Sequence, residues 1–247
     1  MIRLAVAGAV AVATLQRPPV NAICEAWVER LREVVREARQ ARVLLVRSGE
    51  KAFSAGADLA LMRSRFASGA GRAKMVALAR KMQRAFAMLE ASPLVSIAEI
   101  GGAAMGGGHE LALACDVRIA SAAAKLGLPE ARLGLLPGAG GTQRLTRLCG
   151  EAIAKRLILG AEAVDGEEAA RLGIVQWAVP QEELAARAMK LAQDLASLPA
   201  EALAACKRCI AAAGVKEGYE MELEATGTLL ASAETQGRVR AFLEKRR

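Results

Sequence analysis

The sequence predicts an α/β fold with one main domain, and three observations predict it. An apolar run, RVLLVR at 42–47, has the length and composition of a buried strand and ends in a Ser48-Gly49 turn. A second strand, at 94–100, leads into a glycine-rich turn and a helix, so the order strand, turn, helix recurs. The chain has 247 residues, 53% of them hydrophobic and 24% charged, which excludes disordered, collagen-like and disulfide-scaffold classes.

Each further element follows from a local pattern. Valines alternate with small residues about Gly8, which predicts a β-hairpin over the first fifteen residues. Apolar residues at three-four spacing predict amphipathic helices near 23–40 and 72–90, the second ending before Pro93. The other expected elements are a small-residue loop at 53–59, a glycine-rich turn at 101–108, a helix at 110–115, a strand at 117–120 and a glycine-rich loop at 134–141. After residue 150 the Ala-rich, charged pattern predicts helices.

Cysteine usage favours a reducing, cytoplasmic location. The five cysteines are odd in number and scattered, and the chain has a single histidine, which argues against a disulfide framework or a metal site. Cys206 and Cys209 form a C-x-x-C, but they lie in an Ala-rich helical pattern with no neighbouring strand, which favours helix packing over redox or metal chemistry.

The apolar N-terminus resembles a short secretory segment in composition. Its alternation and the lack of a clear polar region before Arg17 favour a strand instead. No other apolar run reaches the roughly 18 residues that a membrane span needs. We therefore expect a soluble, unprocessed chain with no membrane partner.

The formal charge of +8 is concentrated in one stretch. Residues 63–84 contain seven basic and no acidic side chains, namely Arg63, Arg65, Arg72, Lys74, Arg80, Lys81 and Arg84. Such a segment fits an anionic partner, either a phosphate-bearing small molecule or a nucleic acid. A basic face exposed to solvent, with no ligand, explains it equally well.

Two carboxylates and a run of glycines are the candidate catalytic groups. A helix that begins with Gly106-Gly107-Gly108 presents free N–H groups suited to a developing oxyanion, and the run matches no nucleotide-binding motif. Glu110 and Glu130 follow the glycines in apolar surroundings. Each alone is more often structural, but together they could form an acid-base pair. His109, the only imidazole, points about 100° away from Glu110 around the helix, so no histidine-assisted nucleophile is predicted.

Four motifs, in order and spacing, resemble the enoyl-CoA hydratase (crotonase) family. They are RPPVNA at 17–22, FSAGADL at 53–59, GGGHELALACD at 106–116, and PE at 129–130 followed by PGAGGTQRL at 137–145. The resemblance runs from about Arg17 to Pro180, and AFLEKR at 241–246 is similar to the family's usual ending. It implies a crotonase-like ββα spiral core at 1–180 and a C-terminal helical trimerisation region at 181–247, often assembled as a dimer of trimers. It also implies an acyl-CoA substrate, with no metal and no cofactor beyond the coenzyme A of the substrate.

The same resemblance assigns roles to residues. Glu110 and Glu130 match the catalytic carboxylates that hydrate a trans-2-enoyl-CoA to a 3-hydroxyacyl-CoA. The N–H groups of Ala57 and Gly107 would hold the thioester oxygen, which agrees with the helix-start argument, and Gly138 would position the water. The expected substrate and CoA contacts are Ala55, Ala57, Asp58, Leu59, Gly107, Lys51 and Lys245.

One departure and several alternatives accompany these expectations. Many hydratases carry a lysine where this chain has Ala60, so Lys51, Arg63 or Arg65 are the candidates to replace it, with Lys245 reaching across from a neighbouring subunit. A related isomerase, dehydratase or branched-chain hydratase is the alternative activity, and an RNA-binding protein of the same fold is the outside alternative. Apolar residues after 180 predict assembly through the helical tail: Leu184, Met189, Leu191 and Leu195.

Overall fold

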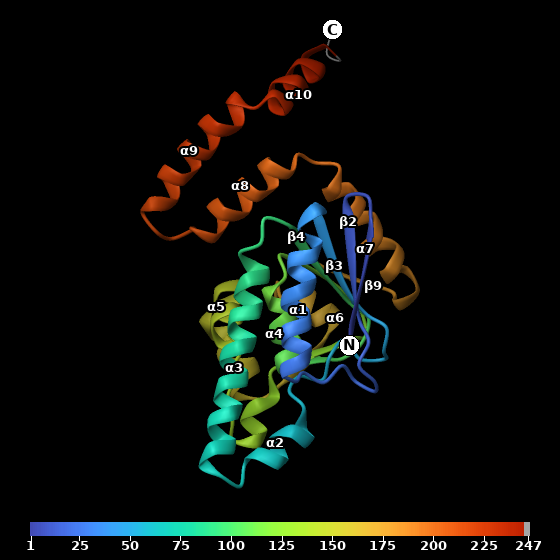
Figure 1. Cartoon of the computed structure of the whole chain (residues 1–247), viewed down its shortest axis with the longest axis vertical. Helices are drawn as coiled ribbons and strands as arrows, with labels where there is room; N and C mark the ends of the chain where they lie inside the picture. The colour runs from blue at the N-terminus through green and yellow to red at the C-terminus, as the bar shows by residue number, and fades with distance from the viewer. Residues whose placement is uncertain (245–247) are drawn as a thin grey trace.

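The computed structural model describes residues 1–244 and contains two sheets flanked by helices (Figure 1). The main sheet has six strands in the order β1-β2-β3-β4-β6-β9, and a small sheet has the order β5-β7-β8. The strands are β1 Ile2–Ala7, β2 Val10–Leu15, β3 Val43–Ser48, β4 Val95–Ile100, β5 Ala104–Met105, β6 Val117–Ser121, β7 Lys125–Gly127, β8 Ala163–Asp165 and β9 Trp177–Val179. Strands β1 and β2 pair antiparallel, which confirms the predicted hairpin, and the other pairs of the main sheet are parallel.

Helices cover both faces of the main sheet. The helices within residues 1–244 are α1 Glu25–Glu37, α2 Leu59–Arg65, α3 Gly69–Glu90, α4 Gly107–Ala114, α5 Gly141–Leu159, α6 Gly166–Arg171, α7 Gln181–Ala196, α8 Ala200–Ala211, α9 Glu217–Ala231 and α10 Ala233–Glu244, with 3-10 turns η1 Ala38–Gln40 and η2 Pro129–Leu133. Ala98 and Ile100 of β4 pack in one cluster with α1, α3 and α4, while Ile97 packs against α7 on the opposite face. Because both faces are covered, β3 begins with the apolar run VLLV rather than with an alternating pattern.

The prediction of helices after residue 150 is incomplete. Two short strands, β8 and β9, lie there, and β9 completes the edge of the main sheet beside β6. Each has only three residues, which is too short for a period-two pattern to stand out from the Ala-rich helices around it. Backbone pairing with an adjacent strand, rather than local composition, creates these two elements.

Helix α7 is part of the core, although it belongs to the region assigned to the C-terminal tail. Leu184, Ala188 and Ala192 lie buried against the sheet, and Met189, Leu191 and Leu195 are partly buried beside them. The expectation that this apolar stripe is hard to bury within one subunit was therefore wrong, because the open face of the sheet accepts it. The exposed apolar side chains lie further along the chain, on α8 to α10.

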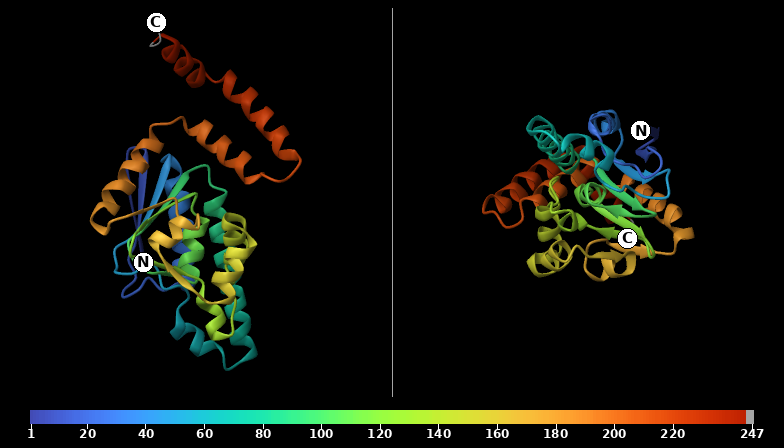
Figure 2. Two further views of the ribbon diagram at one scale, coloured as in Figure 1. Left: turned by 180° about the vertical axis from the view of Figure 1, so that it is seen from behind. Right: turned by 90° about the horizontal axis from the view of Figure 1, so that it is seen from below.

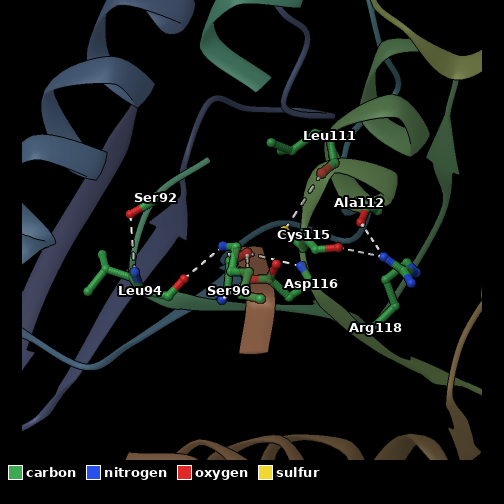
Figure 3. Close-up of polar contacts among 9 residues, drawn as sticks. Ser92, Leu94, Ser96, Leu111, Ala112, Cys115, Asp116 and Arg118 are labelled. Atoms are coloured by element: carbon green, nitrogen blue, oxygen red, sulfur yellow. Dashed lines mark hydrogen bonds and ion pairs between the residues drawn. The ribbon is translucent and has the colours of Figure 1, made fainter. Parts of the chain in front are cut away.

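Helix α8 is fastened to the sheet by a polar cluster at the starts of β4 and β6. Oδ2 of Asp116 accepts hydrogen bonds from the N–H and hydroxyl of Ser96, and the N–H of Asp116 donates back to Oγ of Ser96 (Figure 3). Lys207 of α8 donates to the same Asp116 carboxylate at 2.7 Å and to the carbonyl of Leu94 at 2.9 Å. Beyond this contact, α9 and α10 extend away from the sheet (Figures 1 and 2). Within residues 1–244, no helix combines the length and apolarity needed to cross a membrane.

Candidate active site

A cavity of about 310 Å³ collects the residues that the motifs single out. Its walls come from the loop before α2, from α3, from the start of α4, and from η2 and the loop that leads into α5. The predicted residues that line it are Ala55, Ala57, Leu59, Gly107, Glu110, Glu130 and Gly138. Three of the four motifs, which are distant in sequence, thus meet around one space, while RPPVNA at 17–22 supplies none of its lining residues.

Glu110 lies in the first turn of α4, a helix whose eight residues are all buried. Its Oε1 accepts hydrogen bonds from the N–H of Ala139 at 2.7 Å and from the N–H of Gly141 at 2.8 Å. Gly141 begins α5, so the carboxylate lies at the positive end of that helix. One oxygen of Glu110 is therefore fixed, the other accepts no hydrogen bond from the described residues, and the side chain lines the cavity.

Glu130 enters from η2, directly after Pro129. Its Oε2 is buried and has no hydrogen-bond partner among the described residues. A Cβ added at Gly106 would lie 2.8 Å from Oε1 of Glu130, so the carboxylate occupies the space beside the start of α4 that only glycine leaves open. An unpartnered buried carboxylate is costly unless a ligand or a proton satisfies it.

Burial shifts both carboxylates toward the protonated form. Removal from water raises the pKa of Glu110 to about 7, and the nearby Glu130 adds to the rise, while the two N–H groups and Arg144 oppose it. Burial also raises the pKa of Glu130. Groups that titrate near neutral pH suit acid-base catalysis because both protonation states are populated there.

The raised pKa of Glu110 predicts a pH-dependent stability difference for Glu110→Gln. The unfolded chain loses this proton near pH 4.5 and the folded chain near pH 7, so the free energy of unfolding falls as the pH rises between these values. Glutamine does not titrate and still accepts the two N–H bonds. We therefore expect the melting temperature of the variant, relative to the parent, to rise by several degrees from pH 4.5 to pH 8, which corresponds to roughly 1 to 3 kcal/mol. Thermal melts at both pH values check this, and a difference independent of pH would contradict it.

Ala57 and Gly107 both line the cavity. Among the described residues, neither donates to a carbonyl or a side chain, although the neighbouring Asp58 and Gly106 N–H groups do. The loops that carry them touch at Gly56, where an added Cβ would lie 2.7 Å from the carbonyl oxygen of Met105 and 2.9 Å from the nitrogen of Gly107. Two unpaired donors at the wall of a cavity are the arrangement that stabilises a developing oxyanion.

The remaining predicted site residues fall into three groups. Gly138 lines the cavity, and its carbonyl accepts from Nε2 of Gln83 at 2.8 Å. The Asp58 side chain caps α2 and pairs with Arg17 at 2.7 Å, which lowers its pKa, so its carboxylate faces its own loop rather than the cavity. Lys51 is exposed and lies outside the cavity wall, and the predicted contact at Lys245 falls outside the described residues.

The sequence reasoning missed the apolar end of the cavity. Methionines and leucines form most of this wall: Met62, Met75, Leu78, Met82, Met105, Leu133, Leu135 and Leu136. The three-four spacing on α3 had indicated only a helix packed in the core. The structural sign of this apolar wall is that Leu133 and Leu136 are exposed apolar residues that line the same cavity as the buried carboxyl group of Glu110.

Neither His109 nor any of the seven basic side chains of residues 63–84 lines the cavity. His109 is buried, and burial together with Arg118 lowers its pKa to about 4, so it is neutral at pH 7. In the basic segment, Arg65 pairs with Glu25 of α1, and Lys81 lies 3.6 Å from Glu29 of the same helix. No group of three or more potential metal ligands occurs within residues 1–244.

Comparisons with known proteins show the family of the chain. A family model described as enoyl-CoA hydratase/isomerase matches residues 5–247. The chain is 37% identical to a probable enoyl-CoA hydratase of Bacillus subtilis, covering 100% of this chain and 96% of that protein. It is also 37% identical to a short-chain-enoyl-CoA hydratase of Clostridium acetobutylicum, covering 97% of this chain and 93% of that protein.

Solved structures of similar fold support the same family. Pseudomonas aeruginosa DspI superposes with a TM-score of 0.90 at 39% identity, covering 99% of this chain and 94% of that chain. An enoyl-CoA hydratase of Bacillus anthracis superposes with a TM-score of 0.91 at 34% identity, covering 99% of this chain and 96% of that chain. These likenesses confirm the predicted crotonase-like α/β fold. The chain belongs to the enoyl-CoA hydratase/isomerase family.

Proposed function

We propose that this chain is an enoyl-CoA hydratase, which adds water to a trans-2-enoyl-CoA and forms a 3-hydroxyacyl-CoA. The observation that carries the proposal is the buried Glu110 and the partly buried Glu130 in one cavity with the free N–H groups of Ala57 and Gly107. The relatives named as hydratases support the same reaction. The reaction needs water and the thioester alone, so no further cofactor or metal is proposed.

The proposed mechanism uses each group once. Water lies between the two carboxylates, and the N–H of Gly138 orients it. One glutamate, ionised, takes a proton from the water as the water oxygen bonds to C3, and the double-bond electrons move toward the thioester carbonyl. Ala57 and Gly107 donate to that oxygen as its charge grows. The other glutamate, protonated, delivers its proton to C2, which completes the addition of water.

The cavity wall supports a neutral, apolar acyl group. Within residues 1–244 no lysine or arginine lines the cavity, whereas Met62, Met75 and Leu78 lie along its apolar side. Methionine side chains adapt to ligands of different shape, so several chain lengths can be accommodated. A carboxylate at the far end of the acyl group would be buried without a cation and is disfavoured. We place the CoA moiety against Ala55, Asp58 and Leu59, with Lys51 and Arg63 as its phosphate contacts and Lys245 of a neighbouring subunit as a further one.

A panel of CoA thioesters tests the proposal. It contains trans-2-enoyl-CoAs from C4 to C16, 3-enoyl-CoAs and dicarboxylyl enoyl-CoAs, and loss of the conjugated absorbance reports hydration. We expect turnover of the unbranched 2-enoyl members and much weaker turnover of the dicarboxylyl members. Conversion of only the 3-enoyl members would identify an isomerase, and no conversion of any member would contradict the proposal.

A trimer, or a dimer of trimers, is the proposed assembly. The part of the chain that supports it is α8 to α10, which exposes Ile210, Tyr219, Leu223, Leu230 and Leu243. We expect light scattering at micromolar concentration to give three or six times 25.8 kDa. Leu223→Asp on α9 should lower that mass, whereas Leu159→Asp, an equally exposed position on α5, should not. A monomeric parent protein would contradict the assembly.

A cytoplasmic location and the absence of a nucleic-acid partner remain predictions.

A further inference from the structure

The loop at 137–141 holds Glu110, and its own position depends on two side chains from outside it. The N–H groups of Ala139 and Gly141 both donate to Oε1 of Glu110. The peptide between Gly138 and Ala139 is bonded at both ends, because its carbonyl accepts from Gln83 of α3. Any rotation of this peptide would move a hydrogen bond away from Glu110.

Arg144, in the first turn of α5, is the second side chain that holds the loop, after Gln83. Its Nη1 donates to the carbonyl of Ala139 at 3.1 Å. A Cβ added at Gly140, which has a φ of +108°, would lie 2.3 Å from this Nη1, so the guanidinium fills the space under the loop. The Arg144 side chain is only 9% exposed, which is unusual for a charged group and requires a partner.

That partner is Glu90, the last residue of α3. Nη2 and Nε of Arg144 donate to Oε2 of Glu90 at 2.8 and 3.1 Å, which leaves Nη1 directed at the loop. Glu90 also accepts from Arg147 at 3.0 Å, but the Arg147 side chain is 66% exposed and, within the described residues, donates no hydrogen bond to the loop. The two arginines therefore share one carboxylate, and only one of them reaches the catalytic loop.

We propose that Arg144, oriented by Glu90, is a positioning residue that holds the 137–141 loop and thereby fixes the orientation of Glu110. It touches neither water nor thioester, because it is absent from the cavity wall. The inference rests on the proposed hydration and adds a residue that acts through the loop. A misplacement of a catalytic group by about 1 Å can lower the rate by about 10²-fold, so the position of this loop matters for turnover.

The charge of Arg144 also bears on the protonation of Glu110. The groups that act on Glu110 are Glu130 from η2, the two N–H donors, and Arg144 from α5. Arg144 favours the ionised form of Glu110 and so lowers its pKa against the effect of burial. Removal of this charge should therefore move the pKa of Glu110 upward.

The test compares Arg144→Met with the matched control Arg147→Met. Arg144→Met should lower kcat for crotonyl-CoA by about 10²-fold with little change in KM, since the thioester does not touch this residue. The apparent pKa near 7 in the pH profile of kcat/KM should move to higher pH. Arg147→Met should match the parent in both respects, and Arg144→Lys should recover part of kcat because it retains the charge.

Three outcomes would overturn the inference. They are a folded Arg144→Met protein with the parent kcat and pH profile, a loss as large in Arg147→Met, and no shift in the pH dependence of the melting temperature of Arg144→Met. If Arg144→Met does not fold, Glu90→Gln and Arg144→Lys test the loop contact alone: both keep a cation at position 144, so kcat should fall while the apparent pKa stays near that of the parent, and parent-like kcat in both variants would overturn the inference. The melting measurement needs no activity, so it separates failure of this inference from failure of the proposed hydration, which would appear as an inactive parent protein.

Discussion

Replacing Glu110 or Glu130 with glutamine is expected to lower kcat for a trans-2-enoyl-CoA by at least about 10²-fold in each case. Glutamine keeps the shape of the side chain but neither takes nor gives a proton at the required step. The affinity for a saturated thioester such as butyryl-CoA should stay near that of the parent, because an acid-base group acts mainly on the transition state. Steady-state kinetics and calorimetric titration measure the two quantities.

Glu99→Gln is the matched control for this pair. Glu99 on β4 is a largely buried carboxyl whose pKa burial also raises, and one of its oxygens lacks a partner among the described residues. It lies outside the cavity wall, so its variant should keep the parent kcat. Parent-like turnover in Glu110→Gln or Glu130→Gln would disprove the two-carboxylate mechanism, and an equal loss in Glu99→Gln would attribute the effect to buried charge in general.

Gly56→Ala is expected to lower kcat by about 10² to 10³, the usual contribution of one oxyanion donor. The new Cβ would lie 2.7 Å from the carbonyl oxygen of Met105 and 2.9 Å from the nitrogen of Gly107. Both are backbone atoms, so the loops must move apart, and the N–H groups of Ala57 and Gly107 no longer converge on one oxygen. Backbone donors cannot be removed by truncating a side chain, which makes this glycine the accessible test of the oxyanion site.

Gly173→Ala separates that displacement from simple backbone strain. Gly56 has a φ of +85° and Gly173 a φ of +75°, and an alanine in either place carries a conformational cost of about 1 to 2 kcal/mol. A Cβ at Gly173 meets nothing within 4 Å. Both variants should therefore melt at a lower temperature than the parent, but only Gly56→Ala should lose turnover. Normal kcat in a folded Gly56→Ala protein would refute the assignment of the two donors.

The expected elements that the structure confirms are those with strong local patterns. The hairpin about Gly8, the strand that became β3 and the stripe of α3 all follow from periodicity within a few residues. Strands β8 and β9 lack such a pattern because each is only three residues long and exists through pairing with a neighbour. The apolar face of α7 was visible in the sequence, but its partner, the open face of the main sheet, was not.

The features of the candidate site also divide into those that the local sequence indicates and those that depend on the tertiary structure. The sequence by itself determined the α/β class, and its motifs singled out Glu110, Glu130, Ala57 and Gly107, because glycine runs and isolated carboxylates in apolar segments are local features. Only the tertiary structure decided that these residues share a cavity, that Glu110 is fastened by the start of α5, and that Arg144 reaches under the loop. The physical reason is that burial and hydrogen bonding depend on contacts between segments distant in the chain, and these contacts change the pKa of a carboxylate without any mark in its local sequence.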